Sequence, residues 1–219
     1  ALAHRGPDGD GMAVSGGVGL VQTRLAIIDL ETGDQPLFAS QNTGKEEAGT
    51  GLGAAGVSPG TPRPRTGTGK AALIANGEIY NYVELKLDMG RVEFRTGSDC
   101  EPPLHLYLRH GLDFTRHLRG MYAIALFDPG EDCLVLARDP FGIKPLYYVE
   151  GASGLAFASE PKALIEALIA DKPNITIEWA LAEPTLGKPA VKVLLNFAQI
   201  AIDALVRGGT LDIGAEMRD

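Results

Sequence analysis

Three parts of the sequence carry side chains that could recognise or transform a small polar molecule. Arg24 offers a planar guanidinium that suits a carboxylate, and Asp99 offers an anion for a cationic group. Asn76 and Gly77 follow an apolar run and predict a tight turn, where a side-chain amide and a backbone N–H could converge on a developing oxyanion. Each has an ordinary alternative: Arg24 as a surface ion-pair partner, Asn76 and Gly77 as a plain turn, and Asp99 as a helix N-cap.

The elements that must position these residues follow from the apolar pattern and the turn residues between the runs. Short apolar runs predict strands over residues 18–20, 25–28 and 71–75. Helices are predicted over residues 83–89, 102–110 and 160–169. Closely spaced apolar runs predict an antiparallel meander over residues 121–127, 134–137, 146–149 and 155–158. Many strands with helices grouped outside them predict an α+β layered domain.

Composition excludes several classes of function. The 219 residues include 20 Lys and Arg against 28 Asp and Glu, which gives a net charge of −8. This balance argues against a nucleic-acid partner, which needs a basic face. No apolar run approaches the ~18 residues of a membrane span, and the start lacks the features of a signal peptide. The 2 cysteines make neither a disulfide framework nor a metal site, so we expect a cytoplasmic location.

The amino-acid composition divides the chain into segments. Residues 39–70 are rich in Gly, Thr, Pro and Ser, and we interpret them as a flexible surface insertion, with a functional lid as the alternative. A break at residues 171–174 precedes a last segment of different character. We therefore predict a domain over residues 1–168, a linker over 169–173 and a separate segment over 174–219.

Several short stretches closely resemble the glutaminase domain of glutamine-dependent asparagine synthetases, a class II glutamine amidotransferase. In order, they are HRGPDG (4–9), RLAIID (24–29), NGEIYN (76–81), SD (98–99), RGMYA (119–123), ARDPFGIKPLYY (137–148) and ASEPKAL (158–164). The resemblance covers residues 1–168. It implies a four-layer αββα sandwich of the N-terminal nucleophile hydrolase type, incomplete at its N-terminus. It also implies hydrolysis of the glutamine amide, which supplies ammonia to a separate synthetase domain that amidates aspartate with ATP and Mg²⁺.

The resemblance implies a glutamine site on the matching residues. Glutamine is a zwitterion, so Arg24 would bind its α-carboxylate, and Asp99, helped by Glu78, would bind its α-ammonium group. Asn76 and Gly77 would form the oxyanion hole. The wall beside the ligand would be formed by Leu25, Ala26, Ile27 and Ile28.

The sequence departs from the family at the nucleophile and in the synthetase half. The family's catalytic cysteine stands well upstream of the HRGPDG stretch, and this sequence begins three residues before it. Cys100 has acidic neighbours, which raise the pKa of a thiol, and Cys133 suits a small core position. No pyrophosphate-binding loop follows the domain, so no cofactor is expected on this chain. We therefore expect it to be inactive alone, although able to bind glutamine.

The last segment is similar to the ATPase-like domain of histidine kinases and to bacterial histidine phosphotransferases. Apolar residues at helical spacing over 191–205 precede Gly208 and Gly209, and a strand follows. Asn196 matches that pattern, but Ile200 stands where kinases hold Mg²⁺, and isoleucine offers no oxygen ligand. The alternative is a helix and a strand with no relation to these families.

The alternative function for the whole chain is a non-catalytic binding or signalling module. If the chain is a glutaminase, we expect its partners to be glutamine and either a synthetase domain or a second copy of the chain.

Overall fold

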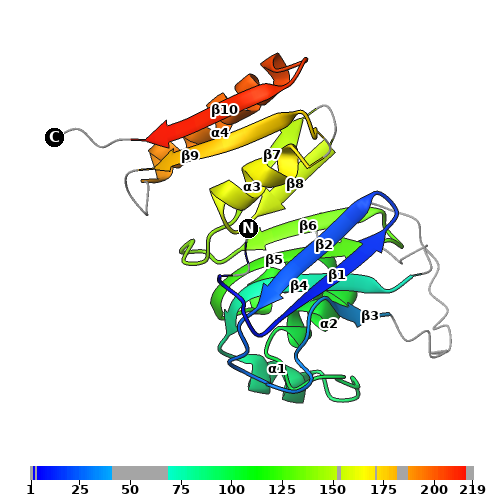
Figure 1. The fold of residues 1–219 in the computed structure, drawn as a ribbon. Helices are drawn as coiled ribbons and strands as arrows, with labels where there is room; N and C mark the ends of the chain where they lie inside the picture. Colours follow the sequence, from blue (N-terminus) through cyan, green and yellow to red (C-terminus); the bar gives the residue numbers. More distant parts are fainter. Residues whose placement is uncertain are drawn as a thin grey trace, which may run out of the picture. The chain divides into compact units, whose positions relative to one another are not determined.

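The computed structural model describes residue 2 and residues 4–40, 69–151, 154–170, 172–181 and 187–215 (Figure 1). Most of the predicted insertion, residues 41–68, lies outside the described residues. The chain divides into two compact units, residues 3–144 and residues 145–219 together with 1–2. The predicted domain limits at residues 168 and 174 stay predictions.

A four-stranded antiparallel sheet forms the centre of the larger unit, with the strand order β3-β4-β5-β6. Its strands are β3 (Leu37–Ala39), β4 (Ala71–Ile79), β5 (Gly120–Asp128) and β6 (Cys133–Arg138). The two central strands, β4 and β5, are the most deeply buried of the four, because both of their faces are covered. Their register places Asn76 opposite Ala123 and Gly77 opposite Tyr122.

The alternation of side chains along β4 and β5 separates two buried faces. One face packs against the helices α1 (Tyr82–Asp88) and α2 (Glu101–His110) and the 3-10 helix η1 (Gly111–His117). Side chains at the centre of this packing include Leu73, Leu104, Phe114, Ile124 and Leu126. The hairpin of β1 (Gly9–Ser15) and β2 (Val18–Arg24) crosses the sheet in Figure 1 and contacts β4. The predicted α+β class is confirmed, with a helical layer, a central sheet and a second, two-stranded sheet in this unit.

Several predicted elements are corrected. Residues 25–28 form a loop rather than a strand, and β4 continues through Asn76 and Gly77, where a turn was predicted. Gly77 makes this continuation possible: its φ is 155°, and a Cβ there would lie 2.0 Å from the carbonyl oxygen of Met121 on β5. The predicted meander is two separate hairpins: β5 and β6 pair within the four-stranded sheet, whereas β7 (Tyr147–Gly151) and β8 (Gly154–Ala158) form a two-stranded sheet of their own.

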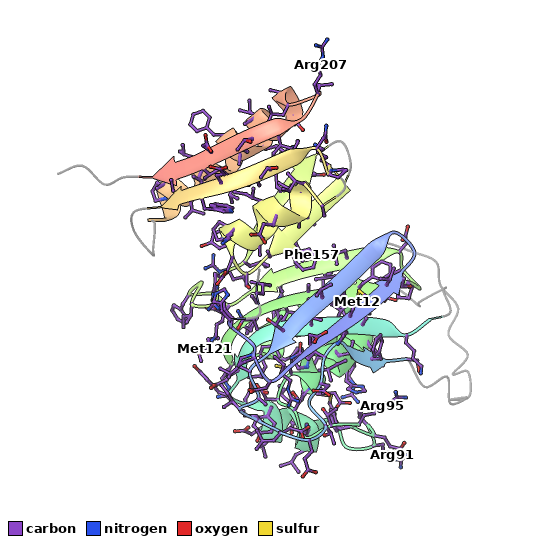
Figure 2. All side chains as sticks on the ribbon, in the orientation of Figure 1. Met12, Arg91, Arg95, Met121, Phe157 and Arg207 are labelled. Carbon is purple, nitrogen blue, oxygen red and sulfur yellow. The ribbon has the colours of Figure 1, made fainter. Side chains whose placement is uncertain are left out.

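The smaller unit combines a hairpin with a parallel βαβ unit. The hairpin strands are β7 (Tyr147–Gly151) and β8 (Gly154–Ala158), and the helix α3 (Pro161–Leu168) follows them. Strand β9 (Ile175–Leu181), helix α4 (Lys188–Ala204) and strand β10 (Gly209–Ala215) come next, and β9 and β10 are parallel. This agrees with the helix and strand predicted on either side of Gly208 and Gly209, where Arg207 projects from the connecting turn (Figure 2).

The core of the smaller unit lies between α3, α4 and the parallel strands. Ile165, Ile175, Ala198, Ile202 and Ile213 form this core and are at most 6% exposed. Considering only helices in the described residues, we find none that is both long and apolar enough to cross a membrane.

Candidate functional site

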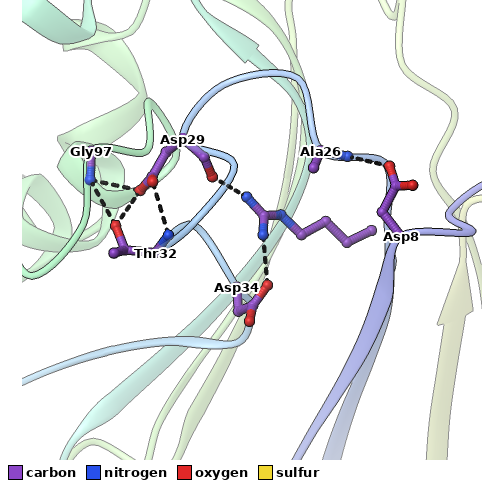
Figure 3. Close-up of polar contacts among 7 residues, drawn as sticks. Asp8, Ala26, Asp29, Thr32, Asp34 and Gly97 are labelled. Atoms are coloured by element: carbon purple, nitrogen blue, oxygen red, sulfur yellow. Dashed lines mark hydrogen bonds and ion pairs between the residues drawn. The ribbon is translucent and has the colours of Figure 1, made fainter.

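Arg24 stands at the end of β2, and its guanidinium contacts two residues of the following loop, Asp29 and Asp34. Both residues of the loop are labelled in Figure 3. Nη1 is 2.6 Å from Oδ1 of Asp34, and Nη2 donates to the backbone oxygen of Asp29. Gly33 lies beneath the guanidinium, and a Cβ there would be 2.7 Å from Nη2. The Arg24 side chain is 11% exposed, whereas that of Asp34 is 81% exposed. The guanidinium of Arg24 is therefore largely shielded from solvent by the backbone of Asp29 and Gly33, whereas its ion-pair partner, the carboxylate of Asp34, is exposed.

The loop that holds Arg24 is organised by the carboxylate of Asp29. The residue has a φ of 55°, and its carboxylate accepts hydrogen bonds from the hydroxyl of Thr32 (2.5 Å), the N–H of Thr32 (2.9 Å) and the N–H of Gly97 (2.7 Å). The hydroxyl of Thr32 is the main group that holds the pKa of Asp29 below its ordinary value. Because Gly97 lies two residues before Asp99, Asp29 joins the Arg24 loop to the segment that carries Asp99.

The HRGPDG stretch closes against the same end of β2. Oδ2 of Asp8 accepts the N–H of Ala26 (2.9 Å), and the N–H of Asp8 donates to the carbonyl oxygen of Arg24 (3.0 Å). Gly6 allows this approach, since a Cβ there would lie 2.4 Å from the backbone nitrogen of Arg24. Sequence reasoning gave no role to Asp8, Asp29 or Asp34, although two of them stand in matched motifs.

Asp99 is buried at the end of β4. It is 4% exposed, and its Oδ2 accepts the N–H of Ile79 at 2.7 Å, which brings it next to Glu78. The N-cap alternative for Asp99 is wrong, because Cys100 occupies the N-cap position of α2. The carboxylate of Asp99 thus accepts a backbone N–H at the end of strand β4 and does not cap the start of helix α2.

The segment before Asp99 is held by Glu101, another residue without a predicted role. Its carboxylate is buried and accepts the N–H of Arg95 (2.8 Å), the N–H of Thr96 (2.8 Å) and the hydroxyl of Thr96 (2.6 Å). Burial raises the pKa of this carboxyl, but the hydrogen bonds from His105, Arg95 and Thr96 outweigh it and lower the pKa to about 2. Glu101 therefore stays ionised and fixes the loop by satisfying its backbone donors.

Asn76, Gly77 and Glu78 are half-buried on β4. Ala75 and Ile79 belong to the helix-side core, so Asn76 and Glu78 point to the opposite face by strand alternation. On β2, Gln22 donates from Nε2 to the carbonyl oxygen of Ala75 at 3.1 Å. The structure thus gathers the end of β2, residues 76–78 and residues 97–99 around one end of β4.

The predicted apolar wall is only partly sheltered. Leu25 and Ile27 are 56% and 64% exposed, and Ala26 and Ile28 are half-buried. They lie on the loop between Arg24 and Asp29, so they border the gathered segments. Their contact with a ligand stays a prediction.

Neither cysteine has the environment of an activated nucleophile. Cys100 is 4% exposed, and burial followed by the negative charge of Asp99 raises the pKa of its thiol. Burial and the neighbouring carboxylate of Asp128 raise the pKa of Cys133. A nucleophilic cysteine needs a lowered pKa. Within the part of the chain that the structure describes, no three His, Cys, Asp or Glu side chains come together as a metal site.

Comparisons with protein families give two matches. The glutamine amidotransferase domain matches residues 1–45 and 55–184. The histidine phosphotransferase C-terminal domain matches residues 158–219, a span that overlaps the first.

Relatives with similar sequences carry the name asparagine synthetase [glutamine-hydrolyzing]. Number 2 of Bacillus subtilis is 37% identical over 164 residues, which is 75% of this chain and 18% of the relative. Number 1 of Saccharomyces cerevisiae is 36% identical over 168 residues (75% and 25%). Asparagine synthetase B of Escherichia coli is 38% identical over 166 residues (75% and 25%). The chain thus spans between 18% and 25% of the length of these relatives.

Two solved structures are similar over part of the chain. Glutamine phosphoribosylpyrophosphate amidotransferase from B. subtilis, complexed with ADP and GMP, is 28% identical with a TM-score of 0.42, covering 59% of this chain and 25% of that one. A structure described as the allosteric regulatory enzyme of purine biosynthesis is 26% identical with a TM-score of 0.47, covering 69% and 29%.

Proposed function

Because the chain belongs to the glutamine amidotransferase domain family, we propose that it is the glutaminase part of a glutamine-dependent asparagine synthetase. In this proposal the domain binds glutamine and its amide is hydrolysed, and the ammonia serves the ATP-dependent amidation of aspartate. The names of the relatives support this acceptor. ATP and Mg²⁺ would serve the synthetase part, and no residue of this chain is assigned to them.

The proposed glutamine site uses the three segments gathered at the end of β4. The guanidinium of Arg24 binds the α-carboxylate, and Asp99 with Glu78 binds the α-ammonium group. The amide of Asn76 and the N–H of Gly77 donate to the oxyanion that forms when the amide carbonyl is attacked. The observation that carries the proposal is the bridge from Arg24 through Asp29 to Gly97, because it ties the cation and the anion of the site together.

Chemistry at this site requires a nucleophile that the described residues do not offer in activated form. Cys100 is protonated and buried, so its sulfur is a poor nucleophile. We therefore expect the polypeptide of this sequence to release ammonia from glutamine only at the background rate. The Cys100→Ser variant is expected to behave identically, and turnover that disappears in this variant would contradict the assignment.

Calorimetric titration with glutamine tests the binding site. Charge-assisted hydrogen bonds are worth about 1.5–3 kcal/mol, so Arg24→Ala and Asp99→Asn should each weaken binding roughly tenfold to a hundredfold. The matched controls Arg91→Ala and Asp88→Asn change exposed residues and should bind as the wild type does. Equal affinity in Arg24→Ala and Arg91→Ala, or no binding by the folded wild type, would contradict the proposal.

The match of residues 158–219 supports a second candidate, a docking module for a receiver domain of a two-component system. On helix α4, Val193, Phe197 and Ile200 are 51%, 66% and 64% exposed and recur at helical spacing. Phe197→Asp should abolish capture of a purified receiver domain without changing glutamine binding. Lys192→Asp, on an exposed position of the same helix, is the control. Capture that survives Phe197→Asp argues against this candidate.

A further inference from the structure

We propose that Asp34 is a built-in competitor for the α-carboxylate of the substrate. This inference rests on the proposed function, because it assumes that Arg24 binds glutamine. The carboxylate of Asp34 contacts Nη1 of Arg24 at 2.6 Å, which is the contact that a substrate carboxylate would make. Glutamine must therefore displace Asp34, so Asp34 lowers the affinity of the site for ligands that carry an α-carboxylate.

The two contacts of the guanidinium differ in how easily they exchange. On the Nη2 side, the partner is the backbone oxygen of Asp29, and that residue is fixed by hydrogen bonds from Thr32 and Gly97. Gly33 also packs within the distance at which a side chain would push the guanidinium away. Asp29 and Gly33 belong to one loop that the hydrogen bonds of Asp29 hold in place. The contact of Nη2 with this loop therefore persists when a ligand enters.

On the Nη1 side, the partner is a side chain in water. Asp34 is 81% exposed, so its carboxylate can rotate into solvent and regain its hydration at little cost. The Arg24 side chain is 11% exposed, and it cannot follow the Asp34 carboxylate without losing its hydrogen bond to the backbone oxygen of Asp29. Exchange at Nη1 therefore replaces one carboxylate by another while the cation stays in place.

The size of the effect follows from the exposure of Asp34. Exposed ion pairs contribute about 0.2–1 kcal/mol, which corresponds to roughly a 1.4- to fivefold change in an equilibrium constant. The apparent dissociation constant for glutamine is raised by this factor, since only the fraction with Nη1 released is competent. Molecules without an α-carboxylate need not displace Asp34, so their affinity does not depend on it.

The test compares Asp34→Asn with the wild type in calorimetric titrations of glutamine and of 4-aminobutanamide, which has no α-carboxylate. Asp34→Asn should bind glutamine up to about fivefold more tightly and bind 4-aminobutanamide unchanged. The gain should shrink between low salt and about 0.5 M NaCl, because salt screens an exposed ion pair. Asp10→Asn is the matched control, since it removes one exposed negative charge from β1.

The outcomes separate this inference from the proposed function. Glutamine binding that is lost in Arg24→Ala but not tightened in Asp34→Asn overturns the competition and leaves the proposed function intact. Equal tightening in Asp10→Asn, or equal tightening for 4-aminobutanamide, also overturns it, because net charge would then explain the gain. If neither the folded wild type nor Asp34→Asn binds glutamine, the proposed function fails and the inference fails with it.

Discussion

Replacing Glu101 with Gln tests whether one buried carboxylate fixes the segment that carries Asp99. Glu101 is 2% exposed, and its oxygens accept hydrogen bonds from Arg95 and from the N–H and hydroxyl of Thr96. An amide keeps the shape of the side chain but turns one acceptor into a donor. That donor then faces the N–H groups that the carboxylate satisfied, so the segment loses its fixed position.

The magnitude follows from the pKa. The carboxyl titrates at about 2 in the folded chain against an ordinary value of 4.5, and each factor of ten in proton affinity is about 1.36 kcal/mol. The ionised carboxylate thus contributes on the order of 3 kcal/mol of stability near neutral pH. Because the folded pKa is the lower one, this stability is complete above pH 4.5 and is lost as the pH falls toward 2.

Thermal unfolding measured against pH checks this reasoning. Near pH 7, Glu101→Gln should lower the melting temperature by roughly 6–12 °C. The difference from the wild type should narrow below pH 4.5, and glutamine affinity should fall with the loosened segment. Glu93→Gln, on an exposed position nearby, is the control. A Glu101→Gln variant that melts with the wild type at neutral pH, or a difference that does not change with pH, would refute the role of the carboxylate.

Three further changes should have distinct effects. Gly77→Ala should destabilise the chain by more than about 2 kcal/mol in urea unfolding, because the new Cβ meets the Met121 carbonyl at a positive φ; a wild-type midpoint would contradict this. Asp139→Ala should cost about 2–4 kcal/mol, since its buried carboxylate accepts several backbone N–H groups, and a neutral effect would exclude that role. Iodoacetamide should modify Cys133 before Cys100 in the native chain, and rapid labelling of Cys100 would contradict its burial.

The sequence correctly predicted those helices and strands whose local pattern agreed with their burial in the folded chain. The apolar run over residues 121–127 forms β5, one of the two central strands, and both faces of that strand are buried. Helix α2 carries the predicted prolines in its first turn, and α4 ends before the glycines expected to stop it. In each case the local preference and the tertiary burial favour the same structure.

Prediction failed where tertiary pairing opposed a local signal. The pair Asn76–Gly77 favours a turn, but pairing with β5 holds both residues in β4. Residues 25–28 have the composition of a strand, yet they form a loop because Asp8 binds the N–H of Ala26 and Asp29 adopts a left-handed conformation. The partners of these two segments, β5 for residues 76–77 and Asp8 for Ala26, lie far away in the sequence. No short spacing in the sequence could therefore reveal them.

The same physics explains why the candidate site was found only in part. Arg24 and Asp99 were identifiable by charge type and motif, but their positions depend on Asp29 and Glu101. The carboxylates of these two residues accept hydrogen bonds from backbone N–H groups of the neighbouring segments. Such a carboxylate has no characteristic sequence partner, because every non-proline residue offers an N–H. A chain with a net charge of −8 can therefore hold Arg24, the cation of the proposed glutamine site, in place with acidic residues. Among the described residues, Asp34 pairs with this cation from an exposed position, and it is therefore the side chain that we propose a substrate carboxylate replaces.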